Sequence, residues 1–220
     1  MKVFEGFHAF VWQDFRENNC NTYFIDREKK ILIDPGHDHL FRHVEQNLKQ
    51  LGVALSQIDY VLITHGHPDH FGSAARMKEW TQAPVAVHEL DAEYVHWGTV
   101  PPLKPITRLG TLFKFAYNAK SEPVEPDVVL HEGDRLNRYA GRGRVILTPG
   151  HTAGSISILL PDGTCLVGDQ PLVVFDVHDH RARLHAWQQR VDVVDLADGV
   201  AVPQVDGVED PGEVGEVGAG

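Results

Sequence analysis

Residues 64–70 read Thr-His-Gly-His-Pro-Asp-His, so four side chains that can bind a metal ion lie within six residues. The stretch completes an apolar segment, residues 59–64, that has the pattern of a buried β-strand. Neutral imidazole and carboxylate are good ligands for zinc and related divalent ions. A loop that leaves a strand can direct alternate residues to different sides, so His65 and His67 can serve one ion while the Asp69–His70 pair serves a second. A histidine-rich surface turn without a metal is the alternative, but so many candidate ligands on one short loop favour the metal site.

Two later segments also end apolar strands in side chains that can bind a metal. Residues 145–155 place His151 in a glycine-rich turn, and residues 165–169 end in Asp169. The two residues lie eighteen positions apart, across a hairpin predicted at Pro161-Asp162-Gly163-Thr164. An aspartate at the end of a strand can be a simple turn former. Its pairing with His151 instead favours a carboxylate that bridges two ions and offsets the repulsion between their charges.

The rest of the chain alternates strand-like and helix-like segments. Short apolar runs bounded by turn residues predict strands, and apolar residues at spacings of three and four predict helices. The predicted strands cover residues 7–12, 21–26, 30–34, 59–64, 84–88, 128–131, 144–148, 155–160 and 164–168, and the predicted helices cover residues 38–51, 73–81 and 91–97. Two β-rich halves with helices suggest two sheets packed face to face with helices outside. The proline-rich segment 98–127 is predicted to cross the surface and to supply loops that contact the substrate.

The composition is that of a soluble globular protein, and the length suits one large domain or at most two small ones. The chain has 220 residues, of which 42% are hydrophobic and 23% are charged, which excludes wholesale disorder. No apolar run reaches the ~18–20 residues of a membrane-spanning helix, and the N-terminus lacks the pattern of a signal peptide. Cys20 and Cys165 are the only cysteines, which excludes a disulfide framework and a cysteine-rich zinc module. We therefore expect a reduced, cytoplasmic setting and no membrane partner.

Negative charge is concentrated at the C-terminal end of the chain. The formal net charge is −11, and residues 191–220 hold eight acidic residues and no basic one. No part of the chain has the basic stripe that nucleic-acid binding needs, so no nucleic-acid partner is expected. Residues 200–220 are almost entirely Val, Gly, Asp, Glu, Ala and Pro, which predicts a disordered acidic tail after a domain over residues 1–199. One hypothesis is that a reading-frame change or a truncation altered this end of the domain.

Taken together, these motifs resemble those of the metallo-β-lactamase-fold hydrolases. The resemblance covers roughly residues 5–172 and rests on the His-x-His-x-Asp-His motif, its ordered followers at 148–155 and 167–169, and the strand-ending Asp34 upstream. It implies an α/β fold, an αββα sandwich of two mixed β-sheets flanked by helices, with the metals at one edge. It also implies a role for each candidate residue: His65, His67 and His151 would hold the first ion, Asp69 and His70 the second, Asp169 both, and Asp34 would orient a ligand histidine.

The sequence departs from this family at the second ion. The family supplies one more histidine, in a Gly-His-Gly-like turn well after the bridging aspartate, and nothing in this chain matches that turn. His178, His180 and His185 come too early and lie in a charged segment, so we interpret them as solvated residues. The second site is thus one ligand short, and we expect weak binding of the second ion or lost activity.

The predicted function is that of a metal-dependent hydrolase acting on a small molecule. The cofactor would be Zn²⁺, as two ions, with iron or manganese as alternatives. A divalent ion lowers the pKa of a bound water from ~15.7 toward ~7, so hydroxide would attack a small ester, thioester, lactone or related substrate. Asp69 would be the catalytic residue that orients the nucleophile or moves its proton. Two alternatives stay open: an oxidoreductase like the mono-iron persulfide dioxygenases, and a catalytically impaired metal-binding remnant.

Overall fold

The computed structural model of the chain describes residues 2–4, 6–14, 16–101, 120–136, 143–160 and 165–169, together with two short strands at 173–174 and 185–186. Several sequence-based expectations concern residues outside these ranges: the middle of the surface segment 98–127, the turn 161–164, His178, His180 and the acidic tail 200–220. The boundary of the predicted domain 1–199 also lies there. These expectations therefore stay predictions.

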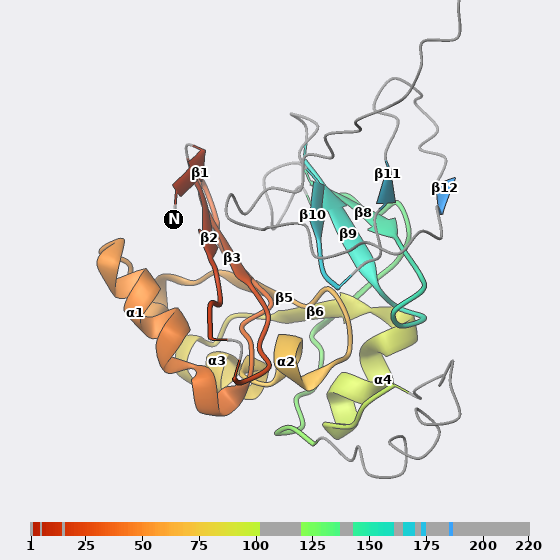
Figure 1. Cartoon of the computed structure of the whole chain (residues 1–220), viewed down its shortest axis with the longest axis horizontal. Helices are drawn as coiled ribbons and strands as arrows, with labels where there is room; N and C mark the ends of the chain where they lie inside the picture. The colour runs from red at the N-terminus through yellow and green to blue at the C-terminus, as the bar shows by residue number, and fades with distance from the viewer. Residues whose placement is uncertain are drawn as a thin grey trace, which may run out of the picture.

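The larger sheet has seven strands that follow one another in chain order (Figure 1). They are β1 (Lys2–Phe4), β2 (Phe7–Phe10), β3 (Thr22–Asp26), β4 (Lys30–Ile33), β5 (Tyr60–Leu62), β6 (Val85–His88) and β7 (Val128–Leu130). Neighbours from β1 to β4 are antiparallel and neighbours from β4 to β7 are parallel, so the sheet is mixed. The parallel half brings the carboxyl ends of β4, β5 and β6 to one edge, which is where ligands bind in sheets of this kind.

The smaller sheet contains three antiparallel strands in the order β10-β9-β8. They are β8 (Arg144–Leu147), β9 (Ile156–Leu159) and β10 (Cys165–Val167), and β11 (Val173–Val174) pairs separately with β12 (His185–Ala186). The antiparallel pairing of β9 with β10 is the one that the predicted hairpin requires. A backbone hydrogen bond of 2.9 Å from Ile156 N to the carbonyl oxygen of Thr64 joins this sheet to the loop that leaves β5.

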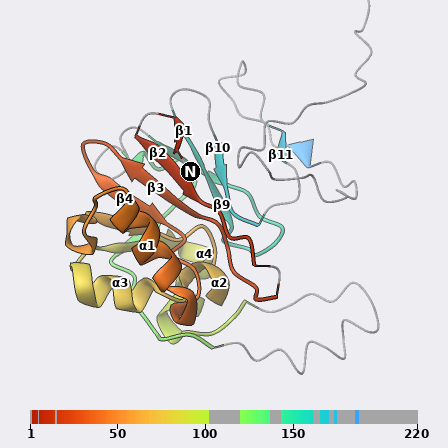
Figure 2. The ribbon, with the colours of Figure 1, turned by 60° about the vertical axis from the view of Figure 1, so that its left-hand side comes forward.

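Helices cover the face of the larger sheet that is turned away from β9 and β10 (Figure 1, Figure 2). They are α1 (Arg42–Gln50), α2 (Pro68–Phe71), α3 (Ala74–Thr81) and α4 (Glu89–Trp97), with short 3-10 helices η1 (Asp38–Leu40) and η2 (Leu55–Gln57). Gly98 ends α4 with φ +63°, a left-handed conformation that glycine adopts without strain. The single turn α2 was not predicted; Pro68 opens it at a position where no helical N–H is needed. Within the described ranges, no helix is long and apolar enough to cross a membrane.

Alternation along the central strands separates two apolar cores. On β5, Val61 belongs to the core beneath the helices, whereas Tyr60 and Leu62 belong to the core between the two sheets. The smaller sheet completes this second core with Val145, Ile156, Ile158 and Leu166. Each fully buried Val, Leu or Ile side chain contributes roughly 1.5–3 kcal/mol relative to an exposed one. The two sheets therefore pack face to face, with a layer of helices outside the larger one.

Candidate metal centre

The carboxylate of Asp34, directly after β4, anchors the loop that carries the histidine motif. It is buried, and its oxygens accept three hydrogen bonds: Oδ1 from Thr64 N (2.8 Å), and Oδ2 from Thr64 Oγ1 (2.6 Å) and His70 Nδ1 (2.8 Å). Asp34 has φ +54°, a conformation that a non-glycine residue keeps only when its surroundings hold it. Its carbonyl oxygen accepts a hydrogen bond of 2.7 Å from the Thr22 hydroxyl. The structure therefore places Asp34 against His70, as its predicted orienting role requires.

His65 has the protonation state of a metal ligand. The hydroxyl of Thr64 donates to Asp34, so its oxygen accepts from Nδ1 of His65 at 3.2 Å. This assigns the proton to Nδ1 and leaves a lone pair on Nε2. The Nε2 atom is buried and has no hydrogen-bond partner among the described residues. Burial and the neighbouring imidazoles hold the pKa of His65 far below its usual range, so the ring is neutral.

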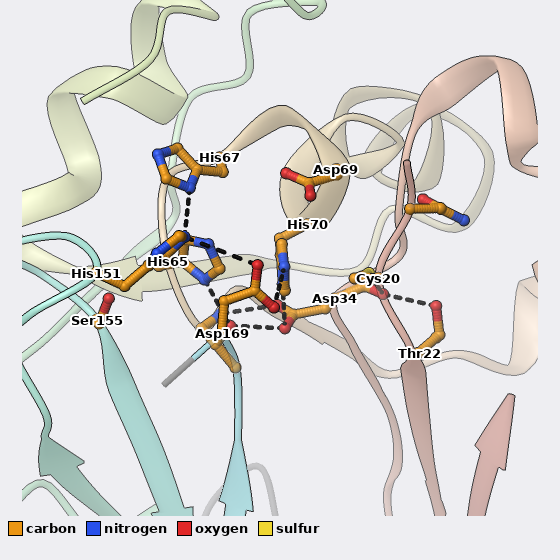
Figure 3. A network of polar contacts seen from close by, with 12 residues as sticks. Cys20, Thr22, Asp34, His65, His67, Asp69, His70, His151, Ser155 and Asp169 are labelled. Atoms are coloured by element: carbon orange, nitrogen blue, oxygen red, sulfur yellow. Dashed lines mark hydrogen bonds and ion pairs between the residues drawn. The ribbon is translucent and has the colours of Figure 1, made fainter. Parts of the chain in front are cut away.

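Three histidines converge from the two sheets. Candidate ligand atoms of His65, His67 and His151 lie within 4.8 Å of one another. The closest pair is His67 Nδ1 and His151 Nε2, at 2.8 Å, and Figure 3 shows these rings directed toward one another. Burial and then the nearby His151 ring lower the pKa of His67, which favours the neutral form. Three histidine imidazoles are a ligand set typical of catalytic zinc.

A second group joins the first through His65. Candidate ligand atoms of His65, His70 and Asp169 also lie within 4.8 Å of one another. His70 Nε2 is 3.3 Å from Asp169 Oδ1, and His151 Nε2 is 3.7 Å from Asp169 Oδ2. Asp169 thus reaches both groups. The donor set, with its partnerless His65 Nε2, fits one or two divalent cations.

The protonation state of His70 differs from that of His65 and His67. Burial opposes its charged form, but the carboxylates of Asp34 and Asp169 outweigh burial and raise the pKa of His70 to about 10. Burial likewise opposes the charge on Asp169, yet the hydrogen bond and charge of His70 lower the pKa of its carboxyl. Without a metal, His70 and Asp169 therefore form an ion pair. A cation would take the place of the proton on His70 Nε2.

Asp69 lies beside the cluster but belongs to neither group. Its side chain is buried, and its Oδ2 accepts a hydrogen bond of 2.7 Å from Nδ2 of Asn18. Figure 3 shows the Asp69 carboxylate apart from the converging histidines. The structure thus brings together five of the six predicted ligands, and Asp69 is the one it leaves outside.

Asp91 is a buried residue of the site that the sequence pattern did not predict as functional. This residue lies in the first turn of α4, and its buried carboxylate accepts hydrogen bonds from Gly66 N and Gly154 N, which belong to the two histidine-bearing loops. The signal that could have found it is the spacing of four residues between Asp91 and the apolar Val95, which places both on one face of α4. A carboxylate on the apolar face of a helix indicates a polar partner across the interface.

Comparison with known proteins extends these observations to a family. The sequence model of the Metallo-beta-lactamase superfamily matches residues 15–169. The chain is 30% identical over 163 residues to "Probable metallo-hydrolase YflN" of Bacillus subtilis, covering 70% of this chain and 62% of the relative. It is 28% identical over 151 residues to "Probable metallo-hydrolase MJ0888" of Methanocaldococcus jannaschii, covering 69% and 66%. The chain thus spans slightly less than two thirds of the length of each of these relatives.

Solved structures show the same architecture. The structure is similar to that of a metallo-β-lactamase motif mutant from Cronobacter sakazakii, with a TM-score of 0.59, 25% identity, and coverage of 75% of this chain and 61% of that one. This likeness confirms the predicted α/β sandwich. The family match includes every residue predicted for the site, from Asp34 to Asp169. The chain therefore belongs to the metallo-β-lactamase superfamily.

Proposed function

We propose that the chain is a zinc-dependent hydrolase that acts on a small ester, thioester, lactone or related substrate. Both relatives described above are named as metallo-hydrolases, which supports hydrolysis as the reaction class. The observation that carries the proposal is the convergence of five side chains in two groups that share His65, whose buried Nε2 has no hydrogen-bond partner among the described residues. A buried imidazole lone pair is unfavourable unless a hydrogen-bond donor, a water or a cation occupies the position it faces, and the four further metal-binding side chains in the two groups favour the cation.

The ligand sets support two ions of unequal affinity. His65, His67 and His151 would hold the first, and a divalent ion there lowers the pKa of water toward ~7 and polarises the bond under attack. His70 and Asp169 would hold the second; Asp69, which the family resemblance also implies for this ion, would have to leave Asn18 to reach it. Because the second set has fewer preformed ligands, we propose that its ion binds more weakly.

Asp69 is the proposed proton acceptor. Its carboxylate is buried beside the cluster, and Asn18 engages only Oδ2. The other oxygen, Oδ1, can accept a proton from the attacking water. Asp69 would therefore fix the direction of the nucleophile while Asp34 fixes the ring of His70.

The test is metal content followed by a hydrolase screen. Elemental analysis of the purified chain should find zinc, and the wild type should turn over one of the esters, thioesters or lactones. The variant His67→Ala should lose turnover by more than the ~10–100-fold that loss of a residue behind the ligands causes. The matched control is His43→Ala, because His43 lies on α1, packs against Trp12 and belongs to neither ligand group.

Each outcome separates the proposed function from its alternatives. Equal turnover by the wild type and His67→Ala would overturn the site. One iron with oxygen consumption would favour a dioxygenase-like oxidoreductase, and no turnover with zinc, iron or manganese would favour a metal-binding remnant. Titration with Zn²⁺ should show one tightly and one weakly bound ion. Two equally tight ions would overturn the proposal that the two ligand sets differ in affinity.

A further inference from the structure

We propose that Asp91 is a positioning residue that sets the distance between the two histidine-bearing loops and thereby the affinity for the metal. The inference rests on the proposed function, because Asp91 has this role only in a site that holds an ion. Its hydrogen bonds go to residues beside the ligands rather than to the ligands themselves. It therefore acts through the backbone of both loops.

One carboxylate binds both loops at once. Oδ2 of Asp91 accepts from Gly66 N at 2.8 Å and from Thr152 Oγ1 at 2.6 Å, and Oδ1 accepts from Gly154 N at 2.9 Å. The Thr152 hydroxyl also lies 2.8 Å from Ser155 Oγ, which places it in a network within its own loop. Asp91 is thus a cross-link between the end of β5 and the turn between β8 and β9.

The cross-linked residues adjoin the ligands. Gly66 lies between His65 and His67, and Thr152 directly follows His151. Across this junction His67 Nδ1 and His151 Nε2 are 2.8 Å apart. Metal–ligand distances tolerate only about ±0.2 Å, so a shift of either loop by ~1 Å would remove a ligand from the ion.

Close packing against the two histidine-bearing loops fixes the position of the Asp91 carboxylate. Asp91 is fully buried. A Cβ on Gly154 would lie 2.6 Å from Asp91 Cγ and 2.7 Å from Asp91 N, and a Cβ on Gly66 would lie 3.4 Å from Asp91 Cβ. Glycine at 154 is therefore needed for the loop to approach α4. The three donors satisfy a buried charge that would otherwise be strongly unfavourable.

An amide cannot replace this carboxylate. The two backbone N–H groups, of Gly66 and Gly154, bind different oxygens of Asp91, and a backbone N–H can only donate. In Asp91→Asn, either orientation of the amide places its NH₂ against one of these N–H groups. The nearly isosteric change therefore releases one loop while keeping the volume of the side chain.

The experiment measures Zn²⁺ affinity by competition with a chromophoric chelator, together with the visible spectrum of the Co²⁺-loaded protein. Asp91→Asn should weaken Zn²⁺ binding by about 10–100-fold and alter the Co²⁺ spectrum, because the ligands shift. Val95→Ala is the matched control: Val95 is fully buried on the same helix but lies in the core beneath the helices. It should lower the melting temperature and leave both metal readouts as in the wild type.

A second pair of variants decides the question if Asp91→Asn does not fold. Thr152→Val removes the hydroxyl that donates to Asp91 and should weaken Zn²⁺ binding. Thr152→Ser keeps this hydroxyl and should bind Zn²⁺ with wild-type affinity. Wild-type affinity for Zn²⁺ in Asp91→Asn or in Thr152→Val would overturn this inference and leave the proposed function standing. A loss of Zn²⁺ affinity in Val95→Ala as large as in those two variants would do the same. Absence of Zn²⁺ binding by the wild type would instead overturn the proposed function and the inference with it.

Discussion

Exchange of Asp34 for asparagine should separate the metal affinity of this protein from its stability. Oδ1 of Asp34 accepts from the backbone N–H of Thr64, which can only donate, so the amide oxygen of Asn must take this place. The NH₂ group then takes the place of Oδ2 and donates to Nδ1 of His70 and to the Thr64 hydroxyl, both now acceptors. Without the charge of Asp34, His70 gives up the proton on Nδ1 and keeps the one on Nε2 beside Asp169. The freed Thr64 hydroxyl can donate to Nδ1 of His65, so that the remaining proton of His65 also lies on Nε2. The lone pairs on Nε2 of His70 and on Nε2 of His65, which would bind the metal, are therefore both lost.

The magnitudes follow from the three hydrogen bonds. The amide still satisfies all three partners, so Asp34→Asn loses only the added strength that the charge of Asp34 gives its hydrogen bonds. The free energy of unfolding of the metal-free protein should therefore fall by about 1–2 kcal/mol. Asp34→Ala leaves three buried donors without an acceptor, at about 1–3 kcal/mol each, and a water in the vacated space limits the total to about 3–6 kcal/mol. Affinity for Zn²⁺ should fall by about 10–100-fold in Asp34→Asn.

Two measurements check this reasoning. Urea denaturation in the presence of a chelator gives the stability, and Zn²⁺ competition gives the affinity. Nitrogen chemical shifts of the histidine rings report which ring nitrogen carries the proton. Wild-type Zn²⁺ affinity in Asp34→Asn, or a proton that stays on Nδ1 of His70, would refute the tautomer argument. A stability loss as large as that of Asp34→Ala would refute the hydrogen-bond count.

Three further predictions concern the metal, the loop contact and pH. Removal of Zn²⁺ with a chelator should lower the melting temperature and abolish turnover, because an ion at 100 times its dissociation constant adds about 2.7 kcal/mol of stability; re-addition should restore both, and an unchanged melting curve would count against a bound ion. Gly154→Ala should destabilise the fold by about 1–3 kcal/mol in urea denaturation, because its Cβ would lie 2.6 Å from Asp91 Cγ; wild-type stability would contradict that contact. The pKa of His70 is raised to about 10 in the metal-free fold, so its charged form contributes stability that is complete below pH ~6.5 and is lost as the pH rises through about 10. Metal-free stability should therefore fall between these values in the wild type and less so in Asp34→Ala.

Local pattern predicted most of the fold and most of the candidate site. The runs before Asp34 and Thr64 are apolar, short and bounded by turn residues, so strand positions followed from neighbours in the sequence. The short helix α2 was not predicted, because its four residues form about one turn and a repeat of apolar residues shows only over several turns. The contact of Asn18 with Asp69 spans 51 positions and that of Asp91 with Thr152 spans 61. Such contacts depend on how β-strands and helices pack, which no local pattern encodes.

The position of the candidate ligands across both sheets would link metal supply to the lifetime of the protein. His67 and His151 are 84 positions apart in the chain, so an ion that binds both would close a long loop. The entropy lost by the unfolded chain on such a closure grows with loop length, which makes a distant cross-link the more effective one. Cells starved of the ion would then hold a chain that opens more often at the junction of its sheets and is degraded faster. Abundance, and not turnover alone, would follow the metal.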